Sequence, residues 1–249
     1  MNENTMNKEK ELESHITLLK KGLNIIQRSD YFNFSIESLL VSEFTSITKS
    51  TKKIMDLGCG NGAIVLFLSQ KTNGQIYGME IQETSYDLAM RNIELNNLSS
   101  QIKIIHDDMK NWDNYFKNDY FDNVVSNPPF FKYSNEKALN DKEQLTIARH
   151  EITITLGELI KIASNLLKDK GYFTLVHRVD RMIEIIEIMK KYNLEPKKIR
   201  FCYTTLSKNA KILLIEAMKN GKPQLTMLPP LVINKKDGSY SDEVLEMFK

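Results

Sequence analysis

The sequence has few cysteines, the residues that form the disulfide bonds of small secreted proteins and many structural zinc sites. Its two cysteines, Cys59 and Cys202, lie far apart and form no CxxC pair, which argues against a disulfide framework and against a zinc site. No apolar run approaches the roughly 18 residues that a membrane-spanning helix needs, and residues 1–21 are polar and mixed in charge, without a signal-peptide core. We therefore expect no bound metal, no membrane association and a cytoplasmic location.

Neither sign of charge is in large excess. The chain has 34 Lys and Arg against 32 Asp and Glu, so its formal net charge is +2. This balance says little about a nucleic-acid partner, because a local basic patch matters more than the sum. The 249 residues are enough for one large α/β domain but not for two. We expect residues 1–22 to form a charged lead-in and residues 23–249 to form a single domain.

Short apolar segments alternate with amphipathic ones along most of the chain, which favours a parallel sheet covered by helices. Two consecutive strands near the C-terminus, without a helix between them, predict an antiparallel hairpin. Strands are expected at residues 53–57, 75–80, 102–106, 121–126, 172–177, 199–203 and 212–218, with an earlier strand-like run at 23–27. Helices are expected at residues 36–47, capped by Ser35, and at 63–70, 83–96, 154–168, 179–191 and 242–248, with Gly171 stopping the fourth.

A glycine-rich loop follows the first of these strands, with the sequence Asp56-Leu57-Gly58-Cys59-Gly60-Asn61-Gly62. In a parallel α/β sheet the ligand crevice lies at the carboxyl ends of the strands, and glycines let the backbone approach a ligand closely. A carboxylate at this place suits an ammonium or a hydroxyl group better than a phosphate. The pattern also lacks the spacing of the dinucleotide fingerprint and of the Walker loop.

Acidic residues follow the next two expected strands as well. Glu80, followed by Ile81, comes about twenty residues after the glycine loop, where an acid can bind both ribose hydroxyls of an adenosine. Asp107 and Asp108 follow the third strand, where a carboxylate can accept a hydrogen bond from the amino group of an adenine. The spacing does not decide between these two acids; the apolar Met109 that follows favours Asp108.

The most informative motif is Asn127-Pro128-Pro129-Phe130, directly after the fourth strand. Two prolines make a rigid turn without backbone donors, so the turn presents carbonyl oxygens, to which Asn127 adds its side-chain oxygen. Phe130 offers a face on which a base can stack. Two acceptors that hold an amino group leave its lone pair aimed at a methyl donor, and they gain strength as positive charge develops on the nitrogen.

The two motifs resemble those of the class I, Rossmann-like methyltransferases, whose amino-methylating members carry an Asn-Pro-Pro-aromatic sequence. The resemblance covers about residues 23–218. It implies an α/β fold with a mostly parallel seven-stranded sheet and an antiparallel C-terminal hairpin, and S-adenosylmethionine as the cofactor. The residues implied for the cofactor are Phe34, Ser35, Asp56, Gly58, Cys59, Gly60, Asn61, Glu80, Ile81, Asp107, Asp108 and Asn127. Those implied for catalysis are Asn127, Pro128, Pro129 and Phe130.

Three shorter segments resemble the bacterial tRNA (adenine-N6)-methyltransferases that modify adenine 37 in the anticodon loop of valine tRNA. They are Phe34-Ser35-Ile36-Glu37, Ala148-Arg149-His150-Glu151 and Val176-His177-Arg178. The resemblance implies tRNA as the partner and leaves the oligomeric state open. Candidate phosphate-binding residues are Lys132, Lys137, Arg149, His150, Arg178, Arg200, Lys208 and Lys211.

Three alternatives stay open from the sequence. Phe130 stands where many DNA and protein members have tyrosine, and phenylalanine is also common in enzymes that methylate guanine N2 of ribosomal RNA. A protein glutamine amide is a third planar amino group that fits the same turn, although the glutamine enzymes usually carry a larger N-terminal helical domain. A non-enzymatic RNA-binding protein is disfavoured by the two intact motifs.

Overall fold

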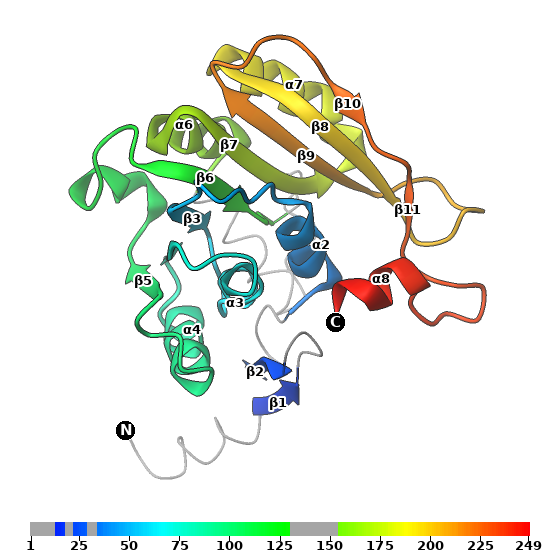
Figure 1. The fold of residues 1–249 in the computed structure, drawn as a ribbon, viewed down its shortest axis with the longest axis horizontal. Helices are drawn as coiled ribbons and strands as arrows, with labels where there is room; N and C mark the ends of the chain where they lie inside the picture. The colour runs from blue at the N-terminus through cyan, green and yellow to red at the C-terminus, as the bar shows by residue number, and fades with distance from the viewer. Residues whose placement is uncertain (1–12, 18–21, 29–33, 130–153) are drawn as a thin grey trace, which may run out of the picture.

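The computed structural model describes residues 13–17, 22–28, 34–129 and 154–249 (Figure 1). Its centre is a nine-stranded sheet with the strand order β10-β8-β9-β7-β6-β3-β4-β5, in which β11 also pairs with β8. The strands are β3 (Lys53–Leu57), β4 (Gln75–Glu80), β5 (Ile102–His106), β6 (Phe121–Ser126), β7 (Leu167–Arg178), β8 (Leu194–Tyr203), β9 (Ile212–Lys219), β10 (Thr226–Met227) and β11 (Leu231–Val232).

The sheet has the predicted direction pattern. Strands β3 to β7 pair in parallel, and β9 lies antiparallel between β7 and β8. The seven predicted strands and the C-terminal hairpin are confirmed, while the two-residue strands β10 and β11 were not predicted. Because the parallel strands share one direction, their carboxyl ends meet at a single edge, where the loops after β3 and β6 leave the sheet.

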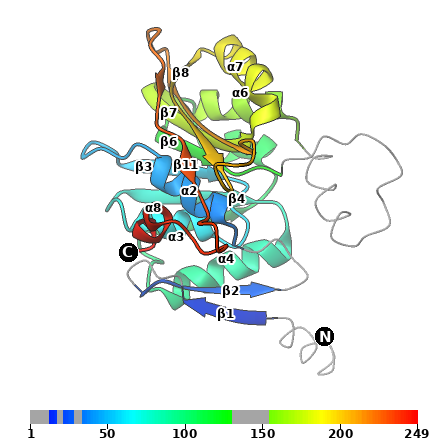
Figure 2. The ribbon, with the colours of Figure 1, turned by 90° about the vertical axis from the view of Figure 1, so that its right-hand side faces the viewer.

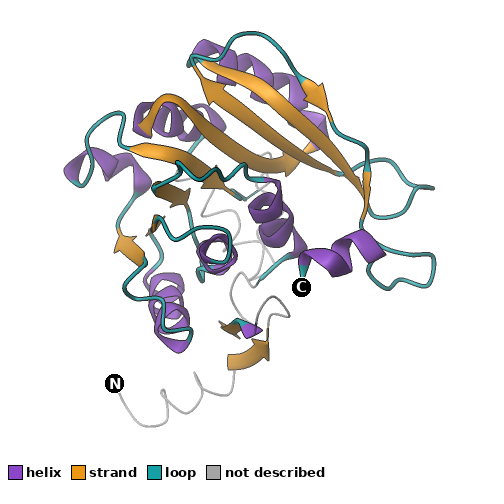
Figure 3. Ribbon diagram, viewed as in Figure 1, coloured by secondary structure: helices purple, strands orange, loops and turns teal. Residues whose placement is uncertain are grey.

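Helices cover both faces of this sheet (Figure 3). The core on one face contains side chains of α2 (Ile36–Phe44), α3 (Ala63–Ser69), α4 (Glu83–Leu95) and α8 (Asp242–Met247). The core on the other face contains those of α6 (Leu156–Leu166) and α7 (Met182–Lys191). Two 3₁₀ turns, η2 (Met109–Asn114) and η4 (Val179–Arg181), follow β5 and β7. In the described parts of the chain, no helix combines the length and apolar character that crossing a membrane requires.

Several predicted boundaries were wrong for local reasons. Helix α2 ends at Phe44 rather than at residue 47. Helix α6 begins with a capping box between Thr155 and Glu158 and ends at Leu166, and β7 starts at the next residue. Gly171 therefore lies inside a strand and does not stop the helix. A Cβ atom there would come within 2.9 Å of the Asp122 carbonyl oxygen, so close backbone packing explains this glycine.

The N-terminal part contains a β-hairpin. Strand β1 (Glu13–Thr17) pairs antiparallel with β2 (Asn24–Arg28), and β2 lies between β1 and α4 (Figure 2). The Arg91 guanidinium of α4 donates to both carboxylate oxygens of Glu13, at 2.6 and 2.8 Å. The division into residues 1–22 and 23–249 stays a prediction, and the structure adds that five residues of the lead-in pair with β2.

Candidate functional site

The glycine-rich loop after β3 curls over the end of β4. Gly58, Gly60 and Gly62 have positive φ values of 76°, 55° and 86°, in the region that side chains disfavour. The amides of Gly58 and Cys59 both donate to the Met79 carbonyl at 3.0 Å. The predicted turn is therefore present, and it is held against the neighbouring strand by backbone hydrogen bonds.

Asp56 stands at the base of this loop and is fully buried. Neither of its carboxylate oxygens has a hydrogen-bond partner among the described residues. Burial, and then the charge of Glu80, raise the pKa of Asp56 well above its usual range. Because buried carboxylates are nearly always paired, an unpaired one at a sheet edge marks a place for an incoming donor or cation.

Two further polar groups share this property. The Ser35 hydroxyl and the Asn61 side-chain nitrogen are buried and, in the part of the chain that is described, lack hydrogen-bond partners. Together with the Asp56 oxygens they are the only such side-chain atoms in the described ranges, and all three residues were predicted to contact the cofactor. Two donors and a carboxylate complement the carboxylate and ammonium groups of an amino acid. S-adenosylmethionine carries those groups, so the residues present fit this cofactor.

Ser35 also corrects an expectation about local structure. It occupies the N-cap position of α2, as predicted, but its side chain makes no capping hydrogen bond. The neighbouring Phe34 packs its ring on Phe67 of α3, with 5.7 Å between the ring centres. The Phe34 amide donates to the side-chain oxygen of Gln27 at 2.8 Å. Phe34 is thus fixed beside the helix that follows the glycine loop, and the cofactor role of Phe34 and Ser35 stays a prediction.

Glu80 ends β4 and is buried, with 3% of its surface exposed. One carboxylate oxygen accepts from the Gly60 amide at 2.9 Å, and the other accepts from the Gln82 amide at 2.8 Å. This carboxylate therefore helps to hold the glycine loop, and each oxygen keeps a lone pair for a further donor. Ile81, the next residue, has 39% of its surface exposed.

The structure distinguishes the two acids after β5. Asp107 accepts from the Asn111 side chain, the Asp108 amide and the Tyr115 hydroxyl, at 2.7 to 2.8 Å. The hydrogen bonds from Asn111 and then Tyr115 lower the pKa of Asp107. Asp108 uses one oxygen to cap η2 at the Lys110 amide, at 2.9 Å. Asp108 therefore has more accepting capacity left than Asp107, and its contact with the cofactor adenine stays a prediction.

The Asn-Pro-Pro turn leaves the sheet beside the glycine loop. Strands β3 and β6 are parallel neighbours with Asp56 opposite Val125, and the Ser126 hydroxyl donates to the Leu57 carbonyl at 2.7 Å. The predicted requirement that the two loops share one edge is therefore met. The Asn127 side-chain nitrogen lies 3.4 Å from the Ser38 hydroxyl of α2, a contact that leaves the side-chain oxygen as an acceptor. Phe130 lies outside the described residues.

Cys59 is a structural member of the loop. Its side chain is buried and lies over Gly78, where a Cβ atom would come within 2.7 Å of the Cys59 sulfur. Burial, together with the charges of Asp56 and Glu80, raises the pKa of the Cys59 thiol. A neutral, buried thiol is a poor nucleophile, so the Cys59 side chain packs in the loop, and contact of this residue with the cofactor stays a prediction.

Two of the predicted RNA-binding lysines lie at the same edge as the turn. Lys208 and Lys211 are exposed on the loop between β8 and β9, and the Lys211 carbonyl accepts from the Val179 amide just after β7, at 3.1 Å. Arg178 ends β7 at this edge, and its guanidinium forms an ion pair with Asp180 at 2.6 Å. These three residues thus share the sheet edge of the Asn-Pro-Pro turn, and their contact with RNA stays a prediction.

Arg200 has a different role from the one predicted. Its guanidinium donates to the Pro229 carbonyl at 2.9 Å and to the Glu243 carboxylate at 2.6 Å, so it ties α8 to the sheet. Only 15% of its side chain is exposed, which argues against a phosphate contact. The remaining candidates, Lys132, Lys137, Arg149 and His150, lie outside the described residues.

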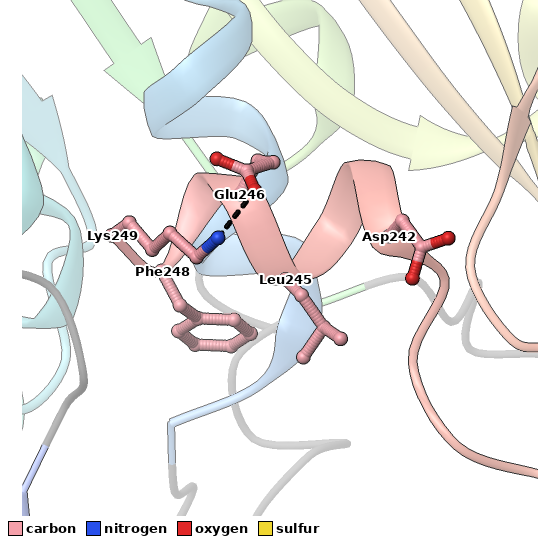
Figure 4. A pocket seen from close by; sticks show the side chains of 5 residues that line it. All are labelled: Asp242, Leu245, Glu246, Phe248 and Lys249. Atoms are coloured by element: carbon pink, nitrogen blue, oxygen red, sulfur yellow. Dashed lines mark hydrogen bonds and ion pairs between the residues drawn. The ribbon is translucent and has the colours of Figure 1, made fainter.

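A pocket of about 510 Å³ lies elsewhere, on α8 (Figure 4). It is lined by Asp242, Leu245, Glu246, Phe248 and Lys249, none of which was predicted to be functional. Lys249 pairs with Glu246 within the lining. Within the described ranges, no cluster of His, Cys, Asp or Glu has the makings of a metal site.

Sequence reasoning missed two residues that support the site. Asn92 of α4 donates to the Asn61 carbonyl in the glycine loop, and Gln27 of β2 fixes Phe34. The available signal was the pair Asn92 and Asn96, two amides one helical turn apart on a face that also carries the buried Ala89 and Ile93.

The sheet order, the glycine loop and the Asn-Pro-Pro turn at one edge define a Rossmann-like methyltransferase. A solved structure from Agrobacterium tumefaciens, described as a predicted O-methyltransferase, has this fold: its TM-score is 0.67 at 18% identity, covering 85% of this chain and 94% of that one. The family model described as methyltransferase small domain matches residues 36–195. The chain therefore belongs to the methyltransferase small domain family, and S-adenosylmethionine is its methyl donor.

Curated relatives that cover most of the chain are named tRNA1(Val) (adenine(37)-N6)-methyltransferase, among them proteins of Porphyromonas gingivalis and Aliivibrio salmonicida. The protein of Porphyromonas gingivalis is 31% identical over 198 residues, which make up 78% of this chain and 76% of the relative. The protein of Aliivibrio salmonicida is 27% identical over 214 residues, or 86% of this chain and 87% of the relative. The similarity thus extends beyond the cofactor motif to about three quarters or more of this chain and of each relative.

Proposed function

We propose that this protein methylates N6 of an adenine in tRNA, at position 37 in the anticodon loop of the valine tRNA on which its relatives act. The observation that carries the proposal is the unpaired, fully buried Asp56 carboxylate at the same sheet edge as the Asn127-Pro128-Pro129 turn. The first group accounts for a cofactor with an ammonium group, and the second for a planar amino group as the acceptor. The names of the relatives favour adenine over guanine and over protein glutamine.

Three sets of residues hold the cofactor in this proposal. Asp56, Ser35 and Asn61 bind its amino-acid end through the groups that lack partners in the described structure. Glu80 accepts from the ribose hydroxyls, and Asp108 accepts from the adenine amino group. When bound, S-adenosylmethionine supplies an electrophilic methyl group on a sulfonium.

The Asn-Pro-Pro turn orients the acceptor. The Asn127 side-chain oxygen and the Pro128 carbonyl accept the two hydrogens of the adenine amino group. This grip keeps the nitrogen lone pair pointed at the methyl donor. As the nitrogen gains positive charge, both hydrogen bonds strengthen, so these acceptors stabilise the transition state more than the ground state. The methylated nitrogen is cationic and acidic, so it loses its extra proton to solvent water, and no side chain has to act as a strong general base.

The substrate must present its base outside a helical stack. A base in an anticodon loop meets this condition, because enzymes that act on a base need it splayed out or flipped. We assign Lys208, Lys211 and Arg178 to the phosphates around that base. They lie at the edge from which the Asn-Pro-Pro turn projects. The net charge of the chain is only +2, so RNA binding in this proposal depends on a small set of local positive charges that contact the phosphates.

The decisive experiment uses unmodified tRNA and S-adenosylmethionine with a labelled methyl group. We expect label in N6-methyladenosine after nuclease digestion, and loss of that label when adenine 37 of the valine tRNA is changed to another base. Label found only on guanine, or only on protein glutamine, would refute the adenine assignment and leave the methyltransferase class intact. Equal labelling of a tRNA without adenine 37 would refute the assignment of position 37 as the methylated site.

A further inference from the structure

One amide in the core joins the two sides of the proposed cofactor site. Asn92 lies in the last turn of α4 and is fully buried. Its side-chain oxygen accepts from the Ile26 amide at 2.6 Å. Its side-chain nitrogen donates to the Ile26 carbonyl at 3.1 Å and to the Asn61 carbonyl at 2.9 Å. The amide therefore uses its acceptor and both of its donors on the backbone of two separate segments.

The first of these segments is the glycine loop. Asn61 carries one of the buried groups without a partner in the described ranges, and the next residue, Gly62, faces α4 closely. A Cβ atom on Gly62 would lie 3.4 Å from the Cβ of Ala89. The bond from Asn92 to the Asn61 carbonyl thus fixes the loop at the point where it approaches the helix.

The second segment leads to the other side of the site. Ile26 lies in β2, and the next residue, Gln27, accepts a hydrogen bond from the Phe34 amide at 2.8 Å. Ser35, which follows Phe34, carries another of the buried groups without a partner in the described ranges. Through β2, Asn92 therefore sets where Phe34 and Ser35 stand relative to the glycine loop.

We propose that Asn92 is a positioning residue that holds Asn61 and Ser35 at the spacing that binds the amino-acid end of the cofactor. The inference rests on the proposed cofactor site, which it deepens. The three backbone groups around Asn92 require one acceptor and two donors, which its side-chain amide supplies. Aspartate has the same shape but no donors, and alanine leaves three buried backbone groups without their partner.

Asn96 provides a matched control. It lies one turn further along the same chain, at the C-cap of α4, and bonds to the amide and carbonyl of Asn24 at 2.9 and 2.7 Å. Its third bond goes to the carbonyl of Asn92, at 2.6 Å. Asn96 thus holds the same strand without contacting the glycine loop, so its loss weakens β2 and leaves the Asn61 contact in place.

The test compares Asn92→Asp, Asn92→Ala and Asn96→Ala by calorimetric titration with S-adenosylmethionine, steady-state kinetics and urea unfolding. We expect both Asn92 variants to raise the dissociation constant and the KM for the cofactor by about tenfold or more, with kcat at saturating cofactor within about threefold of wild type. Asn96→Ala should lose stability with a dissociation constant within about twofold of wild type. Equal weakening by Asn96→Ala, or unchanged binding by the Asn92 variants, would overturn the inference.

A second readout needs no variant. Saturation of the wild-type protein with S-adenosylmethionine should slow hydrogen exchange at the Ile26 amide, because binding stabilises the spacing that Asn92 holds. Unchanged exchange at the Ile26 amide would contradict the inference. Because this measurement uses the wild-type protein, it remains valid if the Asn92 variants fail to fold. Failure of the proposed cofactor site is distinguishable, since the wild-type protein would then bind no S-adenosylmethionine or would bind it equally well after Asp56→Ala.

Discussion

Two buried carboxylates in the same sheet have opposite surroundings. Glu216, in the middle of β9, is 2% exposed and accepts from the amide and hydroxyl of Ser46, at 2.7 Å each, from the Thr174 hydroxyl at 3.0 Å and from the Lys198 ammonium at 3.0 Å. Asp56, at the end of β3, is fully buried and has no such partner among the described residues. The first carboxylate stabilises the fold, and the second is kept for a ligand.

The same fold thus contains one buried carboxyl group with several hydrogen-bond donors and one without a donor among the described residues. Glu216 ties the segment after α2 to β7 and β8 through donors that the protein itself supplies. Asp56 is destabilising in the free protein near neutral pH, because burial without a partner disfavours the ionised form and raises the pKa of the carboxyl group. Such groups persist at sites where a ligand supplies the missing partner. Replacing each group therefore tests whether the contrast is real.

Removal of Glu216 should have the largest effect on stability. Glu216→Ala takes away the acceptor for four donors, so we expect a loss of about 3–5 kcal/mol in the free energy of unfolding, measured by urea denaturation. The control is Glu195→Ala, which removes an exposed ion pair with Lys190 at 3.2 Å and should change stability by no more than about 1 kcal/mol. Similar losses of unfolding free energy in the two variants would contradict the stabilising role of Glu216.

Asn127→Ala should separate catalysis from cofactor binding. The variant lacks one of the two acceptors for the substrate amine, so kcat should fall by about 10²–10³-fold. Binding of S-adenosylmethionine, measured by calorimetry, should stay within a few-fold of wild type. Turnover at the wild-type rate would remove Asn127 from the mechanism.

His177 adds a third buried titratable group to the comparison. It lies near Arg181, Asp180, Glu184 and Arg178, and its Nδ1 atom accepts from the Arg178 amide at 2.8 Å. Burial, with a smaller effect of Arg181, lowers the pKa of His177 from 6.5 to about 4. Between these values the unfolded chain binds the proton and the folded chain does not, so stability is present above pH 6.5 and falls as the pH drops toward 4.

Urea unfolding at pH 7 and pH 4.5 measures this dependence. We expect wild type to lose about 2–3 kcal/mol more than His177→Gln over this interval. Asp56 acts in the opposite direction, because its raised pKa makes protonation favourable in the folded state. The contribution of His177 to the loss of stability is therefore the difference between the losses of wild type and of His177→Gln. An equal loss in both would rule out His177 as the group that titrates.

The smallest expected effect is on RNA affinity. Lys208→Ala and Lys211→Ala should each weaken tRNA binding by a few-fold and reduce its salt dependence by about one ion, without changing the target base. Lys236→Ala, another exposed lysine, is the control and should leave binding unchanged. A change in the methylated position would indicate that these lysines contact bases and not phosphates.

Strands and chemistry-bearing loops were predictable from the sequence because each has a strong local cause. Strands β3 to β6 are short apolar segments followed by glycine, acid or proline, and their predicted bounds match the structure. The shared edge of the two loops follows from the parallel order, which the alternation of strands and helices implies. The sequence alone therefore predicts that Asp56 and Asn127 lie at the same edge of the sheet.

What the sequence left open depends on contacts between distant residues. Asp107 and Asp108 are adjacent, and only the hydrogen bonds of Asn111 and Tyr115 tell them apart. The strand pairing within the N-terminal lead-in depends on α4, whose Asn92 and Asn96 bind β2 from about 70 residues away. Periodicity cannot report such contacts, because they come from the packing of whole elements.

The central claim is that Asp56 is kept unpaired for the cofactor. It is tested most directly by Asp56→Asn, which keeps the shape and replaces the buried acidic group with a neutral amide. We predict a gain of about 1–3 kcal/mol in unfolding free energy for the free protein at pH 7, together with a loss of about 100-fold or more in affinity for S-adenosylmethionine. A variant that is less stable than wild type and binds the cofactor as tightly would contradict the account.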